Sequence, residues 1–255
     1  MAEERVMNRW LVPIGALMVQ LCLGVIYAFS VFVKPLEAAF GWNRAQTTWA
    51  FSINIVAFAL VMTYAGRLQD RIGPRMVCMI GGVIMGIGFI LARFINSLWM
   101  FYLTYGVIAG AGIAFSYVTP IATLVKWFPD MRGLMTGVAV AGFGFSTLIF
   151  GPVAARMIEA VGWQNTFFYL GIIFLVVVVA GSQFLRNPPE GWKPAGWTPP
   201  PAATTATGEK ARVDFQPREL FGIPQAWMLW IMFAFHASAG LMVISSLSPF
   251  AQQKG

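Results

Sequence analysis

Long apolar segments with almost no charged residues recur along this sequence, and they constrain its fold more than any other feature. Each is long enough for a helix to cross the hydrocarbon core of a bilayer, which takes about 20 residues. Strands of a membrane barrel are shorter and alternate in polarity, so helices are the expected form. The predicted spans are 10–33, 46–66, 76–95, 98–125, 133–157, 164–185 and 224–250.

Composition and charge agree with a membrane protein. Only 11% of the 255 residues are charged, against about a quarter in a soluble domain. If the N-terminus is cytoplasmic, 12 of the 17 lysines and arginines fall on the inside and 5 on the outside. This asymmetry explains the net charge of +7 without nucleic acid. We therefore expect an all-α polytopic protein of the plasma (inner) membrane, in contact with lipid and without a nucleic-acid partner.

The composition changes after the sixth span. Residues 187–220 are rich in Pro, Ala and Thr, which is typical of a solvated linker. We expect a six-helix bundle over 1–186, a cytoplasmic linker over 187–220, and over 221–255 the first helix of a second bundle whose remainder is missing from this chain. The first six spans hold no charged residue near the membrane centre, so this half gives no case for proton coupling through a carboxylate.

The most specific motif is the run GRLQDRIGPR between the second and third spans. Gly66 would allow close helix approach, and Gly73 can take a backbone shape that other residues resist. Asp70 beside Arg71 and Arg75 offers a charge cluster that can pair in one conformation and separate in another. An ordinary basic inside loop is the alternative, but the spacing of Gly, Asp and Arg resembles the loop motif of the major facilitator superfamily.

That resemblance implies two six-helix bundles that rock around a central substrate site. It assigns conformational gating to this loop, with Asp70 helping to close the inside face and with Arg71 and Arg75 as charge partners; Gly66 and Gly73 complete the gating set. We expect no enzyme activity, no catalytic residue, no metal and no cofactor. The resemblance also implies a monomer when the protein is full length.

A narrower resemblance comes from the runs KWFPDMRGL at 126–134, NPPEGW at 187–192 and PQAWMLW at 224–230. Together they resemble the oxalate/formate antiporter family, which includes lactate carriers and whose members have about twelve helices. In that family cationic side chains of the second bundle hold the anion. The resemblance implies a secondary transporter of small carboxylates that works by alternating access, and it implies that residues 1–255 alone do not transport.

Candidate pocket residues come from helix geometry. Gln20, Gly24 and Tyr27 share one face of the first span, and polar atoms rarely face lipid, so that face points to a cavity or to a packed interface. Asn54 in the second span either bonds a neighbouring helix or lines the cavity. In the fourth span Tyr117 lies beside a polar stripe, which consists of Ser116, Thr119 and Thr123.

Tyr27 and Tyr117 match, by the family resemblance, tyrosines that line the carboxylate site, where a hydroxyl can donate to a carboxylate oxygen. Their alternative role is packing. The oxalate branch has a glutamine where this chain has Ile26 and a tyrosine where it has Phe143. Both changes remove hydrogen bonds, which favours a monocarboxylate such as lactate or formate over oxalate. The expected substrate-binding residues are Tyr27, Tyr117, Gln20, Phe143 and His236.

His236, the one histidine, lies within the seventh span. It can hydrogen-bond the substrate or carry a proton near neutral pH, or it can hold a contact between helices, and the sequence does not separate these roles. A retinal pump would need a lysine inside the last span, but Lys254 falls past its end, and no H-E-x-x-H or G-x-S-x-G run indicates a membrane enzyme. The remaining alternative is a non-transporting half-protein that acts as an assembly partner in the membrane.

Small residues make the last group of structural predictions. Glycines four residues apart predict close packing of helices. The cysteines Cys22 and Cys78 lie in apolar segments and predict small buried side chains rather than a disulfide. The glycine pairs are Gly82/Gly86, Gly106/Gly110 and Gly133/Gly137.

Overall fold

The structure, a computed structural model of the chain, describes residues 7–189, 191–194, 196–198, 219 and 221–254, with side chains up to Gly240. Its contacts divide the chain into a first unit, Met1–Gly196, and a second unit, Trp197–Gly255, each described by itself. Residues 199–218 of the predicted linker lie outside the described residues. Throughout the described part the regular elements are helical.

The first predicted span is a helix in three parts. It runs through α1 (Leu11–Leu23), the 3-10 helix η1 (Gly24–Ala28) and α2 (Ser30–Phe40). The tighter 3-10 pairing lies in the middle of the predicted span and contains Tyr27. Helix α2 then extends the element beyond the predicted end at residue 33.

Helices α3 (Arg44–Ile72) and α4 (Pro74–Ala92) are joined by Gly73 alone. A capping box begins α3: Asn43 Oδ1 accepts from the Gln46 N–H at 2.8 Å, and Gln46 Oε1 accepts from the Asn43 N–H at 3.0 Å. Gly73 has φ +84°, where a side chain would be strained. Pro74 then takes the first helical position, where its missing N–H costs nothing.

The fourth predicted span changes its hydrogen-bond pattern along its length. It comprises α5 (Leu98–Phe101), the π-helix η2 (Tyr102–Ala109) and α6 (Gly110–Trp127). Helix α6 continues through Pro120, whose missing N–H would leave the Ser116 carbonyl without its helical partner. The Thr119 hydroxyl donates to that carbonyl at 3.0 Å instead, so the helix continues to Trp127.

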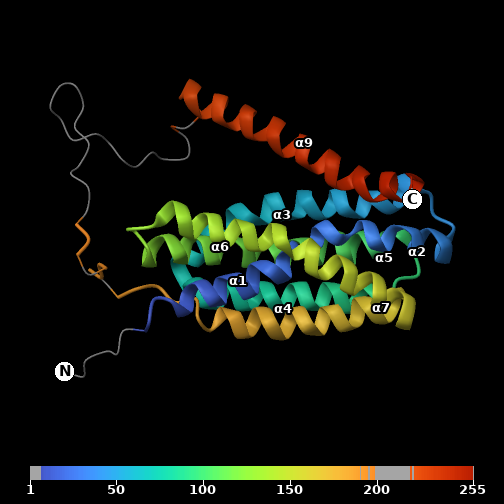
Figure 1. The fold of residues 1–255 in the computed structure, drawn as a ribbon, viewed down its shortest axis with the longest axis horizontal. Helices are drawn as coiled ribbons and strands as arrows, with labels where there is room; N and C mark the ends of the chain where they lie inside the picture. Colours follow the sequence, from blue (N-terminus) through green and yellow to red (C-terminus); the bar gives the residue numbers. More distant parts are fainter. Residues whose placement is uncertain (1–6, 190, 195, 199–218, 220, 255) are drawn as a thin grey trace. The chain divides into compact units, whose positions relative to one another are not determined.

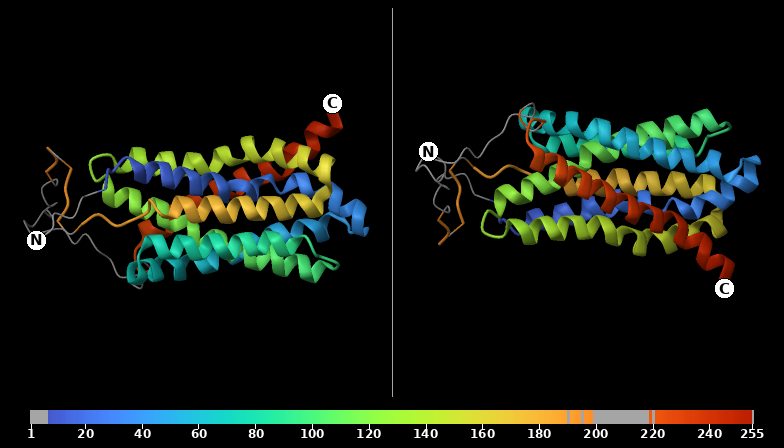
Figure 2. Two further views of the ribbon diagram at one scale, coloured as in Figure 1. Left: turned by 90° about the horizontal axis from the view of Figure 1, so that it is seen from below. Right: turned by 90° about the horizontal axis from the view of Figure 1, so that it is seen from above.

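Helix α7 (Arg132–Ser182) contains the fifth and sixth predicted spans. Its 51 residues would extend about 77 Å if straight, more than twice a hydrocarbon core of about 30 Å. Gly162, with φ +80° and ψ 162°, breaks the helix, and the second half folds back beside the first (Figure 2). The second unit contains α9 (Pro224–Lys254).

Five helices of the described residues are long and apolar enough to cross a membrane, and α7 is one of them. Because α7 doubles back at Gly162, its two halves together with the other four helices give the first unit six crossings. The long helices of the first unit lie side by side (Figure 1). The predicted all-α polytopic fold is therefore confirmed, with the fifth and sixth spans joined by a single glycine.

Glycines bring the helices of the first unit together. A Cβ added at Gly82 would lie 2.6 Å from Val178 Cγ1, and one added at Gly86 would lie 3.0 Å from the Gly171 carbonyl oxygen. The predicted close packing is confirmed for this pair, which admits the second half of α7. Gly133 and Gly137 differ, because an added Cβ meets nothing within 4 Å of either in the described part of the chain.

The KWFPDMRGL run contacts two other segments at one end of the first unit. Arg9 pairs with Asp130 at 3.1 Å, and its guanidinium lies 4.9 Å from the centre of the Phe128 ring. Trp127 Nε1 donates to the Arg186 carbonyl at 2.6 Å, and its ring lies 4.9 Å from that of Trp192. This loop thus holds both the start of α1 and the segment that follows α7.

Candidate substrate site

Phe143 lies between Tyr27 and Tyr117, the two tyrosines predicted to bind substrate. Its ring centre is 5.2 Å from that of Tyr27 and 5.0 Å from that of Tyr117, and both contacts are edge to face. Tyr117 also packs edge to face on Phe58, at 5.3 Å. The four side chains come from η1, α6, the first half of α7 and α3. Residues up to 116 positions apart therefore form one aromatic group, here called the tyrosine cluster (Tyr27, Phe58, Tyr117, Phe143).

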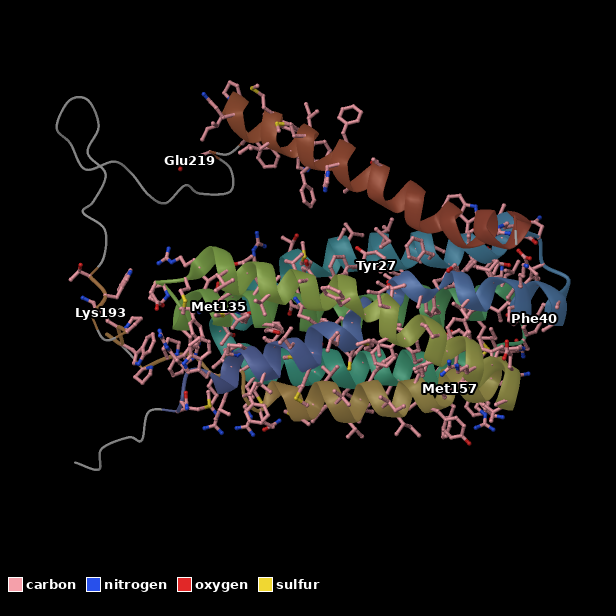
Figure 3. All side chains as sticks on the ribbon, in the orientation of Figure 1. Tyr27, Phe40, Met135, Met157, Lys193 and Glu219 are labelled. Carbon is pink, nitrogen blue, oxygen red and sulfur yellow. The ribbon has the colours of Figure 1, made fainter. Side chains whose placement is uncertain are left out.

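The tyrosine hydroxyls are available to a ligand. Tyr27 and Tyr117 are half-buried, and in the described part of the chain neither hydroxyl has a hydrogen-bond partner or is enclosed as a buried unpaired atom. Tyr27 lies between Met135, near one end of the bundle, and Phe40, near the other (Figure 3). Two O–H donors supported by aromatic rings, at mid-depth in a membrane bundle, suit a small anion with an apolar part.

Gln20 has a different environment from the tyrosines. It is fully buried, and neither its amide nitrogen nor its amide oxygen has a hydrogen-bond partner among the described residues. A Cβ added at Gly142 of α7 would lie 3.5 Å from the Gln20 Cβ, so this side chain faces the packed interface between α1 and α7. Ser146, one turn after Gly142, has a buried hydroxyl that also finds no hydrogen-bond partner in the part of the chain that the structure describes.

Gly24 completes that interface. A Cβ added there would collide with the backbone carbonyl oxygen of Phe143 and lie 2.5 Å from the Ser146 Cβ. Of the predicted face, Gln20 and Gly24 therefore lie in a packed interface, whereas Tyr27 at its other end is half-buried. A substrate would reach the Gln20 amide only if α1 and α7 separated.

The polar stripe of α6 serves packing in this structure. Ser116 donates to the Cys78 carbonyl of α4 at 3.2 Å, and Thr123 donates to the Thr119 carbonyl at 2.7 Å. All three stripe residues are fully buried. Because Tyr117 points instead toward α3 and α7, the stripe and the tyrosine occupy different faces of one helix.

The sequence left the role of Asn54 undecided and did not identify Phe58 as a residue of the site. The Asn54 side-chain amide donates to the Tyr105 carbonyl at 2.6 Å, so it bonds a neighbouring helix. Phe58, one turn further along α3, contacts Tyr117. Their spacing of four residues on one helix face was the available signal, but one apolar face among several in α3 does not show which helix it meets.

The loop motif between α3 and α4 lies open in the first unit. Asp70, Arg71 and Arg75 are exposed, and in the described part of the chain Asp70 forms no ion pair. A Cβ added at Gly66 would meet nothing within 4 Å, so the close approach expected at Gly66 does not occur inside the first unit. The gating role of this motif stays a prediction.

His236 lies on α9, in the second unit, and is exposed there. Its expected role in substrate binding stays a prediction. Within the described residues no group of three or more His, Cys, Asp and Glu side chains could hold a metal ion. The tyrosine cluster in the first unit is therefore the candidate site that the structure describes.

A bundle of helices that are long and apolar enough to cross a membrane is typical of polytopic membrane proteins. The family model of the major facilitator superfamily matches residues 15–255. The chain belongs to the major facilitator superfamily, which is a family of transporters and not of enzymes. The resemblance inferred from the loop motif is thereby confirmed.

Three relatives show the closer similarities. The uncharacterized MFS-type transporter YhjX of Escherichia coli is 31% identical over 96% of this chain and 58% of its own length. The oxalate:formate antiporter of Oxalobacter formigenes is 27% identical over 97% of this chain and 57% of its own. Human monocarboxylate transporter 7 is 28% identical over 70% of this chain and 35% of its own. The chain thus spans little more than half the length of the first two relatives.

Proposed function

We propose that this chain is part of a secondary transporter of small carboxylates that works by alternating access. The observation that carries the proposal is the tyrosine cluster, in which two tyrosine rings flank one phenyl ring where four helices meet, with no hydrogen-bond partner for either hydroxyl among the described residues. Two relatives are named for oxalate and formate and for monocarboxylates. A carboxylate needs such donors, and an alkyl substituent needs the apolar ring beside them.

A monocarboxylate such as lactate or formate is the favoured substrate. Phe143 supplies no hydrogen bond at the centre of the cluster, and Ile26 is buried and apolar. A dianion such as oxalate has two charged ends that both need partners. Counterflow of labelled lactate should therefore exceed that of labelled oxalate in proteoliposomes that contain the product of the complete open reading frame. Faster exchange of oxalate would contradict this preference.

Removing the hydroxyls one at a time tests the site directly. Tyr27→Phe and Tyr117→Phe keep the rings and should each raise the KM for the carboxylate about tenfold or more, because a hydrogen bond to a charged group is worth about 1.5–3 kcal/mol. Tyr64→Phe is the matched control, since Tyr64 is exposed on α3 and outside the cluster. Unchanged KM values for both Tyr27→Phe and Tyr117→Phe would contradict the proposed site.

The membrane orientation and the domain plan belong to the same proposal. We infer a cytoplasmic N-terminus and a cytoplasmic 187–220 linker from the placement of basic residues, with 1–186 as one bundle and 221–255 as the start of another. Reaction of single cysteines at exposed positions with a membrane-impermeant maleimide tests this orientation. The second candidate function, a half-protein that assembles without transport, predicts no saturable uptake even from the complete open reading frame.

A further inference from the structure

A π-helix in the first half of the fourth span stands out from the regular helices around it. In η2 each N–H pairs with the carbonyl five residues earlier, so the segment holds one residue more than an α-helix with the same ends. Such insertions are often found at functional sites. If the segment returned to α-helical pairing, the helix on one side would rotate by about 100° relative to the other, which is the angle of one residue.

On both sides of this π-helix, aromatic side chains pack against neighbouring helices. On the N-terminal side Phe101 is buried, with its ring centre 6.2 Å from that of Phe29 of the first span. On the other side Tyr117 packs on Phe143 and Phe58. A rotation of about 100° would move either Phe101 or Tyr117 off its partners, so the π-helical register is what lets both sets of contacts exist together.

Asn54 bonds the π-helix at this point. Its amide donates to the Tyr105 carbonyl at 2.6 Å, and nearer the start of the π-helix the Tyr102 hydroxyl donates to the Gln46 carbonyl of α3 at 2.8 Å. Glycines allow the approach: a Cβ added at Gly106 would lie 2.8 Å from Ile53 Cγ2, and one added at Gly110 would lie 2.8 Å from the Asn54 carbonyl oxygen. The short amide therefore reaches the Tyr105 carbonyl only because α3 and the π-helix lie in close contact.

The same face of α3 reaches the candidate site. Phe58 follows Asn54 by one turn and contacts Tyr117 directly. We propose that Asn54 is a positioning residue for substrate binding, which fixes the register of the π-helix so that the Tyr117 hydroxyl faces the site beside Phe143. The role of Tyr117 in binding substrate rests on the proposed function, whereas the positioning of Tyr117 by Asn54 can be tested without substrate.

The experiment uses the complete protein with 3-fluorotyrosine in place of tyrosine, including the six tyrosines of residues 1–255, and the fluorine resonance of Tyr117 is assigned with Tyr117→Phe. Asn54→Leu keeps a similar size and removes the amide donor. It should shift the Tyr117 or Tyr105 resonance, and amide exchange over 102–110 should rise about tenfold, the value of one hydrogen bond. The Tyr64 resonance, on the exposed side of α3, should stay in place.

Thr104→Val is the matched control. Thr104 donates to the Met100 carbonyl at 2.8 Å within its own helix, so this variant removes a hydrogen bond from the same segment without touching α3. It should leave the Tyr117 resonance unchanged. An Asn54→Leu spectrum identical to that of the wild type would overturn the proposal. If Asn54→Leu does not fold, Asn54→Ala replaces it. Rapid hydrogen exchange of the backbone amides of residues 105–110 in the wild type would also overturn the proposal, and this test needs no variant.

Transport separates positioning from a general loss of stability. Asn54→Leu should raise the KM as Tyr117→Phe does, and the double variant should show no further increase, because both changes remove one contact. Fully additive effects would contradict the positioning role. The fluorine spectra are recorded without substrate. If the carboxylate proposal fails, the resonance shift in Asn54→Leu should therefore still be seen. If the positioning proposal fails, the effects of Tyr27→Phe and Tyr117→Phe on KM should still be seen.

Discussion

Tyr27 and Phe143 meet edge to face with their ring centres 5.2 Å apart and their planes at 80°, although 116 positions separate them in the chain. The contact joins the 3-10 turn of the first span to the first half of α7. Edge-to-face pairs of this kind contribute about 0.5–1.5 kcal/mol beyond the burial of their area. They hold the Tyr27 ring in place, and its hydroxyl has no hydrogen-bond partner among the described residues.

Phe143 is expected to set the preference between carboxylates. Phe143→Tyr adds a hydroxyl between the two tyrosines, and a further donor to a charged oxygen is worth about 1.5–3 kcal/mol. The ratio of oxalate to lactate exchange should rise about tenfold or more in counterflow with the complete protein. Phe145→Tyr is the control, because Phe145 lies on the same helix and is exposed. An unchanged ratio would show that Phe143 does not face the substrate.

The close contact at Gly24 should tolerate no side chain. Gly24→Ala would press a methyl group against the backbone carbonyl of Phe143, and overpacking of this kind typically costs about 1–3 kcal/mol. Gly144→Ala on the same interface helix meets nothing within 4 Å in the first unit, and should be neutral or stabilising by up to about 1 kcal/mol. Thermal unfolding can be followed by a dye that reacts with the buried thiols of Cys22 and Cys78. Equal stability of the two variants would refute the packing.

Arg9 and Asp130 should be coupled energetically. Their side chains are 26% and 23% exposed, so the pair is only partly screened by water and should contribute about 0.5–1 kcal/mol. Arg9 also lies over the Phe128 ring, which adds a contact that Asp130→Asn alone would not remove. A double-mutant cycle of Arg9→Gln and Asp130→Asn in thermal unfolding measures the coupling. Arg132→Gln, an exposed neighbour, is the control, and a coupling of zero would count against the pair.

Asp70 is expected to act in the conformational cycle rather than in folding. Because it is exposed and forms no ion pair among the described residues of the first unit, Asp70→Asn should change the free energy of unfolding by less than about 0.5 kcal/mol. Transport by the complete protein should nevertheless fall about tenfold, as loss of a gating contact worth about 1.4 kcal/mol requires.

The control for Asp70→Asn is Glu159→Gln, which removes an exposed acid from α7. It should leave both transport and stability unchanged. A fully active Asp70→Asn variant would mean that the loop motif serves no gating purpose here. A strongly destabilised variant would mean instead that Asp70 supports the fold.

Much of the fold could be predicted because a bilayer permits few solutions. Apolar segments of about 20 residues must be helical in lipid, so the spans were read with errors only at their ends. The predicted division at 157–164 corresponds to the break at Gly162. The 3-10 turn at Gly24–Ala28 and the π-helix at Tyr102–Ala109 were not predicted, because their hydrogen-bond patterns depend on neighbouring helices rather than on residue type.

The sequence by itself determined that the chain is a helical membrane protein, which loop connects its second and third spans, and which residues share a helix face. Only the tertiary structure decided what each face meets. Gln20 and Tyr27 share a face by spacing, yet one is enclosed against α7 and the other keeps its hydroxyl accessible. The physical reason is that periodicity fixes direction around one helix axis, whereas burial depends on contacts between distant segments, such as the hydrogen bond from Asn54 to the Tyr105 carbonyl.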